Sequence, residues 1–268
     1  MNSGEDWDVI WKWHWFRRQL WQPHYRDANH AEGRIARKTP MLRQVLQQYG
    51  ATRVLDANCG LGLRALLLNE AGFDVTGTDV SPLAIRHAIE LAEFHNQPVH
   101  FETCTWDLLG ERFHEEFDAV LTDGIGWIRD LAELQTAFNN FAAVLKPGGV
   151  VLFAGIDQWS PSEARFQHVE HAWKAAPRFQ IRASFMQQRT HMTLVVARDR
   201  EELAITENYL FVIHEDGTPR LETASIRTTL EWTWADFENV CNQSGFASVR
   251  TIRVLVGSRE HHMNAAHK

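Results

Sequence analysis

The sequence predicts an α/β protein with a doubly wound, mostly parallel, Rossmann-like sheet of seven strands, an antiparallel β insertion and an N-terminal helical lid. Apolar strand-like runs alternate with helical runs between residues 53 and 157, and this rhythm predicts parallel strands joined by right-handed crossovers. After residue 157 come long strand-like runs with little helix between them, which predict the antiparallel insertion. Five tryptophans among the first 21 residues mark the N-terminal segment.

The elements of the parallel core follow in order along the chain. Two helices are expected first, at 5–22 and 32–49. Strands are then expected at 53–57, 73–79, 99–106, 117–124 and 150–157. The helix after the second strand has Ser81 as its N-cap and Pro82 at its first helical position. A Pro-Gly-Gly turn at 147–149 is expected to close the helix before the last of these strands.

The insertion is expected to begin with a helix at 160–176 and to continue as strands. The strand-like runs are 179–188, 191–199, 204–216 and 221–232. A turn signal, EDGTPR, joins the last two. The chain then returns to helix, with Thr233 as its N-cap and Gly245 at its end, and residues 246–258 supply the final strand or strands.

These elements divide the chain into five segments. They are a Trp-rich helical lid at 1–30, the Rossmann-like core at 31–157, the helix and antiparallel insertion at 158–232, the return to the core at 233–258, and a loose polar tail at 259–268.

The composition indicates a globular protein whose surface is not built for nucleic acid. Apolar residues make up 44% of the 268 residues, which suffices for a core. The net charge of −7 argues against a nucleic-acid groove. Three widely spaced cysteines are typical of reduced thiols in the cytoplasm. With no signal peptide or membrane span in the sequence, we expect a cytoplasmic protein without membrane or nucleic-acid partners, and a homo-oligomer stays open.

A glycine-rich turn, VLDANCGLG at 54–62, follows the first strand of the core. Glycines there let the backbone approach a ligand closely, and the next helix offers free N–H groups at its start. Asp79 ends the following strand, 17 residues after Gly62, where an acidic residue accepts hydrogen bonds from ribose hydroxyls. The spacing is not G-x-G-x-x-G, so a dehydrogenase is disfavoured.

Five motifs in order resemble those of class I S-adenosylmethionine (SAM)-dependent methyltransferases. VLDANCGLG resembles their first motif, TGTDVSPLAI the ribose-binding motif and TCTWDLL the adenine-side motif. FDAVLTDGIGWI resembles the fourth motif, and VLKPGGVVLF is similar to the turn and strand after it. The resemblance implies SAM as the cofactor and no metal. It implies cofactor-binding roles for Asp56, Ala57, Asn58, Gly60, Gly62, Asp79, Val80, Trp106, Asp107 and Asp123.

Other segments resemble glycine and sarcosine N-methyltransferases. The helix before the first motif looks like theirs, and there Arg34 would reach the carboxylate of the SAM methionine. LWQPHY resembles their lid segment, which implies cofactor or substrate contacts by Trp21, His24 and Tyr25. The strand-rich stretch after residue 157 resembles the arm that they place above the substrate.

The departures from that pattern bear on the substrate. Ile125 stands near the place of an asparagine in those enzymes, and Ile156 stands near the place of an arginine that clamps the substrate carboxylate. Without a charge-assisted clamp, glycine itself is a poor substrate. Asn58 also replaces a usual glycine or alanine and either crowds the cofactor or bonds to it.

Methyl transfer from a sulfonium needs positioning more than a catalytic triad, and none is evident in the sequence. We expect the contacts nearest the reaction from Asp123, at the rim after the fourth strand, and from His24 and Tyr25 in the lid. His168, His171 and His214 are expected on solvated or structural positions rather than at a metal.

The aromatic residues suggest an apolar site. The N-terminal tryptophans fit core or lid packing, an aromatic box for a cationic amine, or a partner surface. A roof is expected from Trp21, Phe185, Tyr209, Phe211 and Trp232, with Asp123 and Asp157 as guides for a cationic nitrogen. We therefore expect a small aromatic or heterocyclic acceptor, methylated on nitrogen or oxygen, with nitrogen favoured. The alternatives are a SAM-binding protein without turnover and a methyltransferase with a protein target.

Overall fold

The structure is a computed structural model. It describes residues 4–21, 26–27, 33–128, 130–153, 177–201, 204–229, 233–256 and 259–268.

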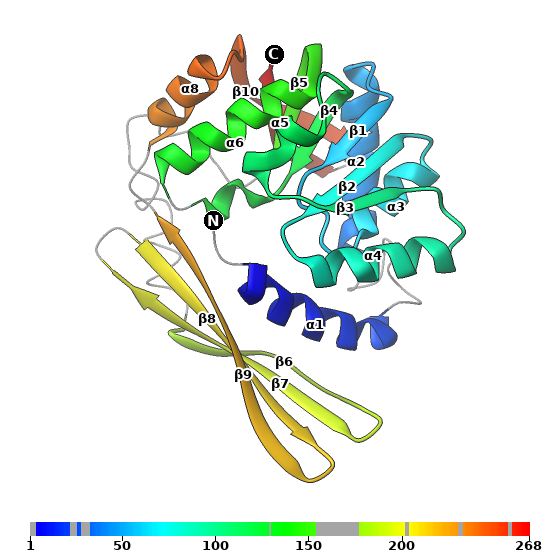
Figure 1. The fold of residues 1–268 in the computed structure, drawn as a ribbon, viewed down its shortest axis with the longest axis vertical. Coiled ribbons are helices and arrows are strands. Elements are labelled where there is room, and N and C mark those ends of the chain that lie inside the picture. The colour runs from blue at the N-terminus through cyan, green and yellow to red at the C-terminus, as the bar shows by residue number, and fades with distance from the viewer. Residues whose placement is uncertain are drawn as a thin grey trace.

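A seven-stranded sheet forms the core, in the strand order β10-β11-β5-β4-β1-β2-β3 (Figure 1). Its strands are β1 (Arg53–Asp56), β2 (Asp74–Asp79), β3 (His100–Thr103), β4 (Phe117–Thr122), β5 (Leu145–Phe153), β10 (Ser248–Val256) and β11 (Arg259–His267). The strands from β5 to β3 in this order pair in parallel, whereas β11 is antiparallel to both β5 and β10. The predicted doubly wound, mostly parallel sheet is therefore confirmed.

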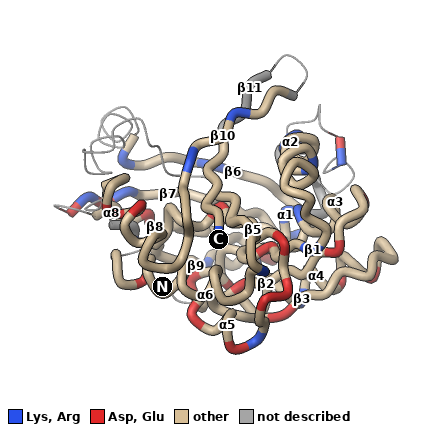
Figure 2. Tube along the Cα trace, turned by 90° about the horizontal axis from the view of Figure 1, so that it is seen from above, with Lys and Arg blue, Asp and Glu red and all other residues tan. Residues whose placement is uncertain are grey.

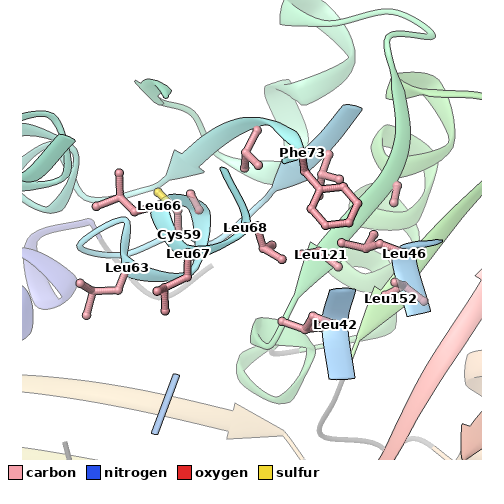
Figure 3. Close-up of a cluster of buried hydrophobic side chains, with 14 of the residues drawn as sticks. Leu42, Leu46, Cys59, Leu63, Leu66, Leu67, Leu68, Phe73, Leu121 and Leu152 are labelled. Carbon is pink, nitrogen blue, oxygen red and sulfur yellow. The ribbon is translucent and has the colours of Figure 1, made fainter. Parts of the chain in front are cut away.

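Helices cover both faces of this sheet. They are α2 (Arg34–Gln48), α3 (Leu63–Glu70), α4 (Pro82–Phe94), α5 (Leu109–Arg112), α6 (Leu131–Val144) and α8 (Trp234–Gln243), with short 3₁₀ turns η3 (Trp106–Leu108) and η4 (Gly124–Trp127). Because side chains alternate along a strand, Val54 packs under α2 and α3, whereas its neighbour Leu55 packs under α6 and α8. Figure 3 shows the leucine-rich cluster on the first of these faces.

Local signals in the sequence begin α4 and α8 as expected. The Ser81 hydroxyl accepts a hydrogen bond from the Ala84 N–H at 3.0 Å, and Pro82 is the first residue of α4. Thr233 and Asp236 form a reciprocal capping box at the start of α8. None of the helices in the described ranges is long and apolar enough to cross a membrane.

A separate four-stranded antiparallel sheet, here called the arm, follows the core strand β5. Its strands are β6 (Phe179–Gln187), β7 (Thr190–Arg200), β8 (Ala204–Glu215) and β9 (Thr218–Thr229), paired in that order. Asp216 and Gly217 have φ of 49° and 83° in the two-residue turn between β8 and β9, so the EDGTPR turn is confirmed. The helix expected at 160–176 lies outside the described residues.

Helix α1 (Gly4–Trp21) lies between the core and the arm (Figure 1). Ile10 and Trp13 are buried against the arm strands, whereas Trp11 and Trp15 pack against the core. A helix that is apolar on more than one side is stable only when more than one side is covered. The expected lid is therefore a packed layer in this structure, with Trp13 packed on the arm and Trp11 and Trp15 packed on the core.

Two expectations are corrected by the sheet. The polar tail at 259–268 is not loose but forms the inner strand β11, with Met263, Ala265 and Ala266 buried. The helix α6 ends at Val144, and residues 147–149, expected as its closing turn, already belong to β5, which begins at Leu145.

Acidic residues gather around α5, α6 and β3 on one side of the core (Figure 2). This placement agrees with the net charge of −7.

The burial of β11 can be tested by placing a charge on it. Ala265→Asp should lower the free energy of unfolding by at least about 3 kcal/mol, because an unpaired carboxylate would lie in the core. Ala247→Asp, at an exposed position just before β10, is the matched control and should change stability little. Chemical denaturation checks both variants, and equal stabilities would mean that the tail is not part of the sheet.

Candidate active site

A cavity of about 870 Å³ lies where the core, α1 and the arm meet. Its core wall is made by residues that follow the carboxyl ends of β1, β2, β3 and β4, where open parallel sheets bind their ligands. Helix α1 contributes Trp7, Trp11 and His14, and the arm contributes Arg182, Leu194 and Tyr209.

The glycine-rich turn after β1 needs its glycines. Gly60 and Gly62 have φ of 54° and 78°, a region that favours glycine. A Cβ at Gly60 would lie 2.5 Å from the Trp11 ring, and one at Gly62 would lie 2.8 Å from Phe101. The two glycines therefore allow α1 and β3 to approach the turn closely.

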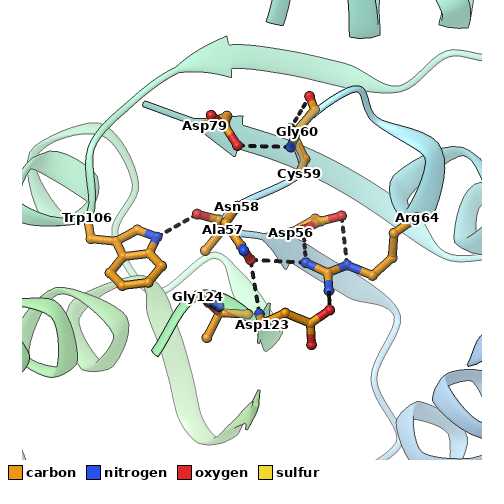
Figure 4. A network of polar contacts seen from close by, with 11 residues as sticks. Asp56, Ala57, Asn58, Cys59, Gly60, Arg64, Asp79, Trp106, Asp123 and Gly124 are labelled. Atoms are coloured by element: carbon orange, nitrogen blue, oxygen red, sulfur yellow. Dashed lines mark hydrogen bonds and ion pairs between the residues drawn. The ribbon is translucent and has the colours of Figure 1, made fainter. Parts of the chain in front are cut away.

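Asp79, at the end of β2, holds this turn in place. One carboxylate oxygen accepts a hydrogen bond from the backbone N–H of Gly60 at 2.9 Å (Figure 4). The other accepts from the backbone N–H of Ser81 at 3.0 Å. Burial raises the pKa of Asp79 to about 6, although those two N–H groups act in the opposite direction. The side chain lines the cavity beside Val80, so its remaining lone pairs lie at a ligand-accessible position.

Trp106 forms the neighbouring wall after β3. Its indole N–H donates to the carbonyl of Ala57 at 2.5 Å, and a Cβ at Gly124 would lie 2.8 Å from its ring. The ring is 9% exposed and lines the cavity together with Thr105. A buried aromatic ring fixed in this way offers a flat apolar wall to the cavity that the Asp79 carboxylate also lines.

On the side of the glycine-rich turn away from Asp79, the Arg64 side chain connects helix α3 with the end of β1 and the end of β4 (Figure 4). It forms a two-pronged ion pair with Asp56, at 3.0 Å and 2.5 Å, and also donates to Asn58 at 3.1 Å and Asp123 at 2.9 Å. Asn58 in turn accepts from the backbone N–H of Asp123 at 3.1 Å. Asn58 therefore ties the end of β1 to the end of β4.

This group carries one more negative than positive charge. Burial by itself lowers the pKa of Arg64, but the carboxylates of Asp56 and Asp123 outweigh it and hold that pKa above the ordinary arginine value. Asp56 is fully buried and matched by Arg64, whereas the Asp123 side chain is 46% exposed. Asp123 is therefore the carboxylate of this group that a ligand can reach.

Three tryptophans line the cavity on the side of α1 and η4. Trp7 stacks on Trp11 with ring centroids 6.4 Å apart and lies 6.2 Å from Trp127. The indole nitrogen of Trp11 is buried without a hydrogen-bond partner in the described part of the chain. The cavity thus has an aromatic wall that it shares with the Asp123 carboxylate.

The structure brings together about half of the site residues expected from the sequence. Those that line the cavity are Ala57, Asn58, Asp79, Val80, Trp106 and Asp123. Asp56, Gly60 and Gly62 shape the turn behind them, whereas Asp107 is exposed and is not among the lining residues.

Several expectations fall elsewhere. His24, Tyr25, Ile156, Asp157, His168, His171 and Trp232 lie outside the described residues, as do the side chains of Trp21 and Arg34. Of the expected roof, Tyr209 lines the cavity, but Phe185 and Phe211 stack on α1 instead. Ile125 is fully buried in the core, and His214 is exposed near the outer turn of the arm.

Sequence reasoning missed three of the residues that line the cavity, namely Trp127, Arg64 and Arg182, whereas Trp7 belongs to the tryptophan cluster for which an aromatic box was one interpretation. Arg64 had a signal, because it is the one charged residue in the apolar run LGLRALLL, eight positions after Asp56. Arg182 had none, since its place depends on the register of β6.

Comparison with known proteins relates the chain to methyltransferases. Residues 54–149 match the family model described as a methyltransferase domain. A glycine/sarcosine N-methyltransferase of Parasynechococcus marenigrum is 32% identical over 111 residues, which are 41% of this chain and 39% of that protein. The rat glycine N-methyltransferase is 29% identical over 147 residues, which are 50% of this chain and 49% of the relative. The chain therefore spans about half the length, or less, of these curated relatives.

Solved structures share the fold over most of the chain. The sugar N-methyltransferase KedS8 of Streptoalloteichus superposes with a TM-score of 0.65 at 18% identity, covering 87% of each chain. The SAM-bound amino pentose methyltransferase CalS10 of Micromonospora echinaspora gives 0.60 at 15% identity, covering 92% of this chain and 96% of its own. The fold is thus the Rossmann-like fold of class I methyltransferases.

The Arg64 ion pair should be structurally costly to break. Arg64→Gln should lower the free energy of unfolding by about 3–5 kcal/mol, because it leaves the buried Asp56 carboxylate without its partner. The double variant Asp56→Asn/Arg64→Gln should recover most of that loss. Arg189→Gln breaks an ion pair whose arginine is 82% exposed and should cost about 1 kcal/mol or less. Urea denaturation measures all three, and a double variant no more stable than Arg64→Gln would contradict this account.

Proposed function

We propose that this chain, with its class I methyltransferase fold and the methyltransferase domain matched over residues 54–149, transfers a methyl group from SAM to a small aromatic or heterocyclic acceptor, on nitrogen in preference to oxygen. One observation carries the proposal. A single cavity is lined by residues of the glycine-rich turn and Asp79 together with the tryptophans of α1 and η4 and the Asp123 carboxylate.

The described residues fit SAM by their chemistry. The carboxylate of Asp79 lies at the end of β2, as an acceptor for ribose hydroxyls requires. Val80 and Trp106 supply apolar surface next to it for the adenine. The six-membered ring of Trp11 covers Gly60 and adds apolar surface beside the glycine-rich turn. Bound SAM supplies a methyl group on a sulfonium sulfur, which is already activated for transfer.

The three tryptophans and Asp123 support the proposed class of acceptor. Aromatic faces and a carboxylate attract a cationic nitrogen and also the sulfonium. Trp7 and Trp127 offer flat apolar surface to an aromatic or heterocyclic ring. An amine must lose its proton before attack, and a site with a partly exposed carboxylate can accept that proton or pass it to water. The chain's own contribution is mainly to hold the acceptor in line.

The relatives named as glycine and sarcosine N-methyltransferases raise the question of glycine as the acceptor. Ile125, near the position of their asparagine, is fully buried and presents no polar group to the cavity. The large apolar share of the lining favours a ring over an amino acid as small as glycine. The position of the cavity beneath the arm favours a small molecule over a protein target.

Cofactor affinity should depend on pH through Asp79. The pKa of about 6 means that about one tenth of this carboxyl is ionised at pH 5. Because ribose hydroxyls need the ionised acceptor, binding strengthens as pH rises, and SAM should bind about tenfold more weakly at pH 5 than at pH 7.5. Asp79→Asn should weaken binding at pH 7.5 by about tenfold or more and abolish the pH dependence. Calorimetric titration measures this, with Asp74→Asn on the exposed start of β2 as the control. Equal SAM affinities of Asp79→Asn and the wild type would contradict the proposal that Asp79 binds the ribose hydroxyls.

The acceptor class should appear in a transfer screen that follows S-adenosylhomocysteine release. The screen covers glycine, sarcosine, aromatic amines, phenols and carboxylates. We expect turnover of aromatic or heterocyclic amines, and Asp123→Asn should lower their kcat/KM about tenfold while the affinity for S-adenosylhomocysteine, which has no sulfonium charge, changes less than twofold. Turnover confined to glycine and sarcosine would overturn the acceptor proposal, and SAM binding without any turnover would favour a binding protein.

A further inference from the structure

The arm wall of the cavity contains an irregular strand that the proposed function leaves unused. Strand β6 pairs with β7, but the register shifts between Ile181 and Ala183. Ile181 lies opposite Val195 and Ala183 lies opposite the next residue of β7, so Arg182 has no residue opposite it. A β-bulge of this kind redirects one side chain relative to a regular strand.

The bulge places an arginine on the cavity. In a regular strand, consecutive side chains point to opposite faces of the sheet. Arg182 and Ala183 nevertheless both line the cavity. Without the bulge, only one of these two neighbours could face the site.

Two neighbours hold the Arg182 side chain, but they do not occupy all of its N–H donors. Its Nη2 donates to Glu207 Oε1 at 3.0 Å, and its guanidinium lies 5.8 Å from the centre of the Tyr209 ring. A guanidinium has five N–H donors, more than these two neighbours take. The side chain keeps 33% of its surface exposed. The remaining donors are therefore free to meet a ligand in the cavity.

Glu207 does not neutralise the positive charge of the Arg182 guanidinium. The same carboxylate oxygen also accepts from Arg198 Nε at 2.7 Å, and the other oxygen accepts from the Tyr209 hydroxyl at 2.8 Å. Two guanidinium groups thus face one carboxylate, and the cluster has a net charge of +1. Burial raises the pKa of Tyr209 to about 12, with help from Glu207, so the phenol stays neutral and adds no negative charge.

We propose that Arg182 binds an oxyanion of the acceptor, a carboxylate or a phosphate. The acceptor's nitrogen then lies toward Asp123 and the tryptophans, and its acidic group lies toward the arm. A planar guanidinium binds such groups through two parallel hydrogen bonds. The sequence lacks an arginine near Ile156, where the resemblance would put a carboxylate clamp, and Arg182 supplies that chemistry from another strand. This inference rests on the proposed function, because it selects among the small acceptors of that same site.

The test uses pairs of acceptors that differ in the acidic group alone. Tyrosine with tyramine and histidine with histamine test a carboxylate, and pyridoxamine phosphate with pyridoxamine tests a phosphate. Binding to the full chain saturated with S-adenosylhomocysteine is measured by calorimetry, and KM is measured by methyl transfer. We expect the acidic member of at least one pair to bind tenfold or more tightly than its neutral partner.

The arginine is then changed. Arg182→Gln should abolish that preference, Arg182→Lys should restore part of it, and binding of the neutral members should stay within twofold of the wild type. Arg178→Gln removes another arm guanidinium, which pairs with Asp199 at 2.8 Å and does not line the cavity, and should leave the preference unchanged.

The proposal is overturned if acidic and neutral members bind equally, if no acidic member binds, or if Arg182→Gln weakens both members alike. Methyl transfer to neutral amines alone would also overturn it while leaving the proposed function in place. A binding preference that depends on Arg182, without transfer to any acceptor, would support the oxyanion site and count against the proposed function.

Discussion

Helix α1 is apolar on two sides, and the cavity exists because both sides are covered. Ile10 and Trp13 pack on the arm, and Trp11 packs on the core over Gly60. Fully burying a side chain such as Ile10 contributes roughly 1.5–3 kcal/mol. Polar contacts fix the position of α1 along the arm, since the Trp13 indole N–H and Lys12 both reach Glu222, at 2.8 Å and 2.7 Å. The core edge, the aromatic wall and the arm are thereby held around one space.

Charge is distributed unevenly across that space. On the core side, Arg64 is outnumbered by Asp56 and Asp123, which leaves a negative end. On the arm side, Arg182 and Arg198 outnumber Glu207, which leaves a positive end. Under the two proposals, an acceptor with a basic nitrogen and an acidic group would be oriented by this difference before methyl transfer. Preorganised orientation of this kind is what a reaction that depends on positioning requires.

The sequence predicted those parts whose signals are local. The caps at Ser81 and Thr233 and the alternation of the core depend on neighbours along the chain. The strand β11 was missed because most of its residues are polar and because its burial results from pairing with β5 and β10. Arg182 could not be placed because a bulge changes which residues share a face. Contacts between distant segments are the information that a local pattern does not contain.

The most direct test of the account is a crystal structure of the protein with S-adenosylhomocysteine. The account predicts ribose hydroxyls on the Asp79 carboxylate, adenine beside Val80 and Trp106, and the sulfur facing the part of the cavity lined by Asp123 and Trp127. Cofactor bound outside this cavity, or a sulfur turned away from that aromatic wall, would contradict the claim that both halves of the cavity form one methyl-transfer site.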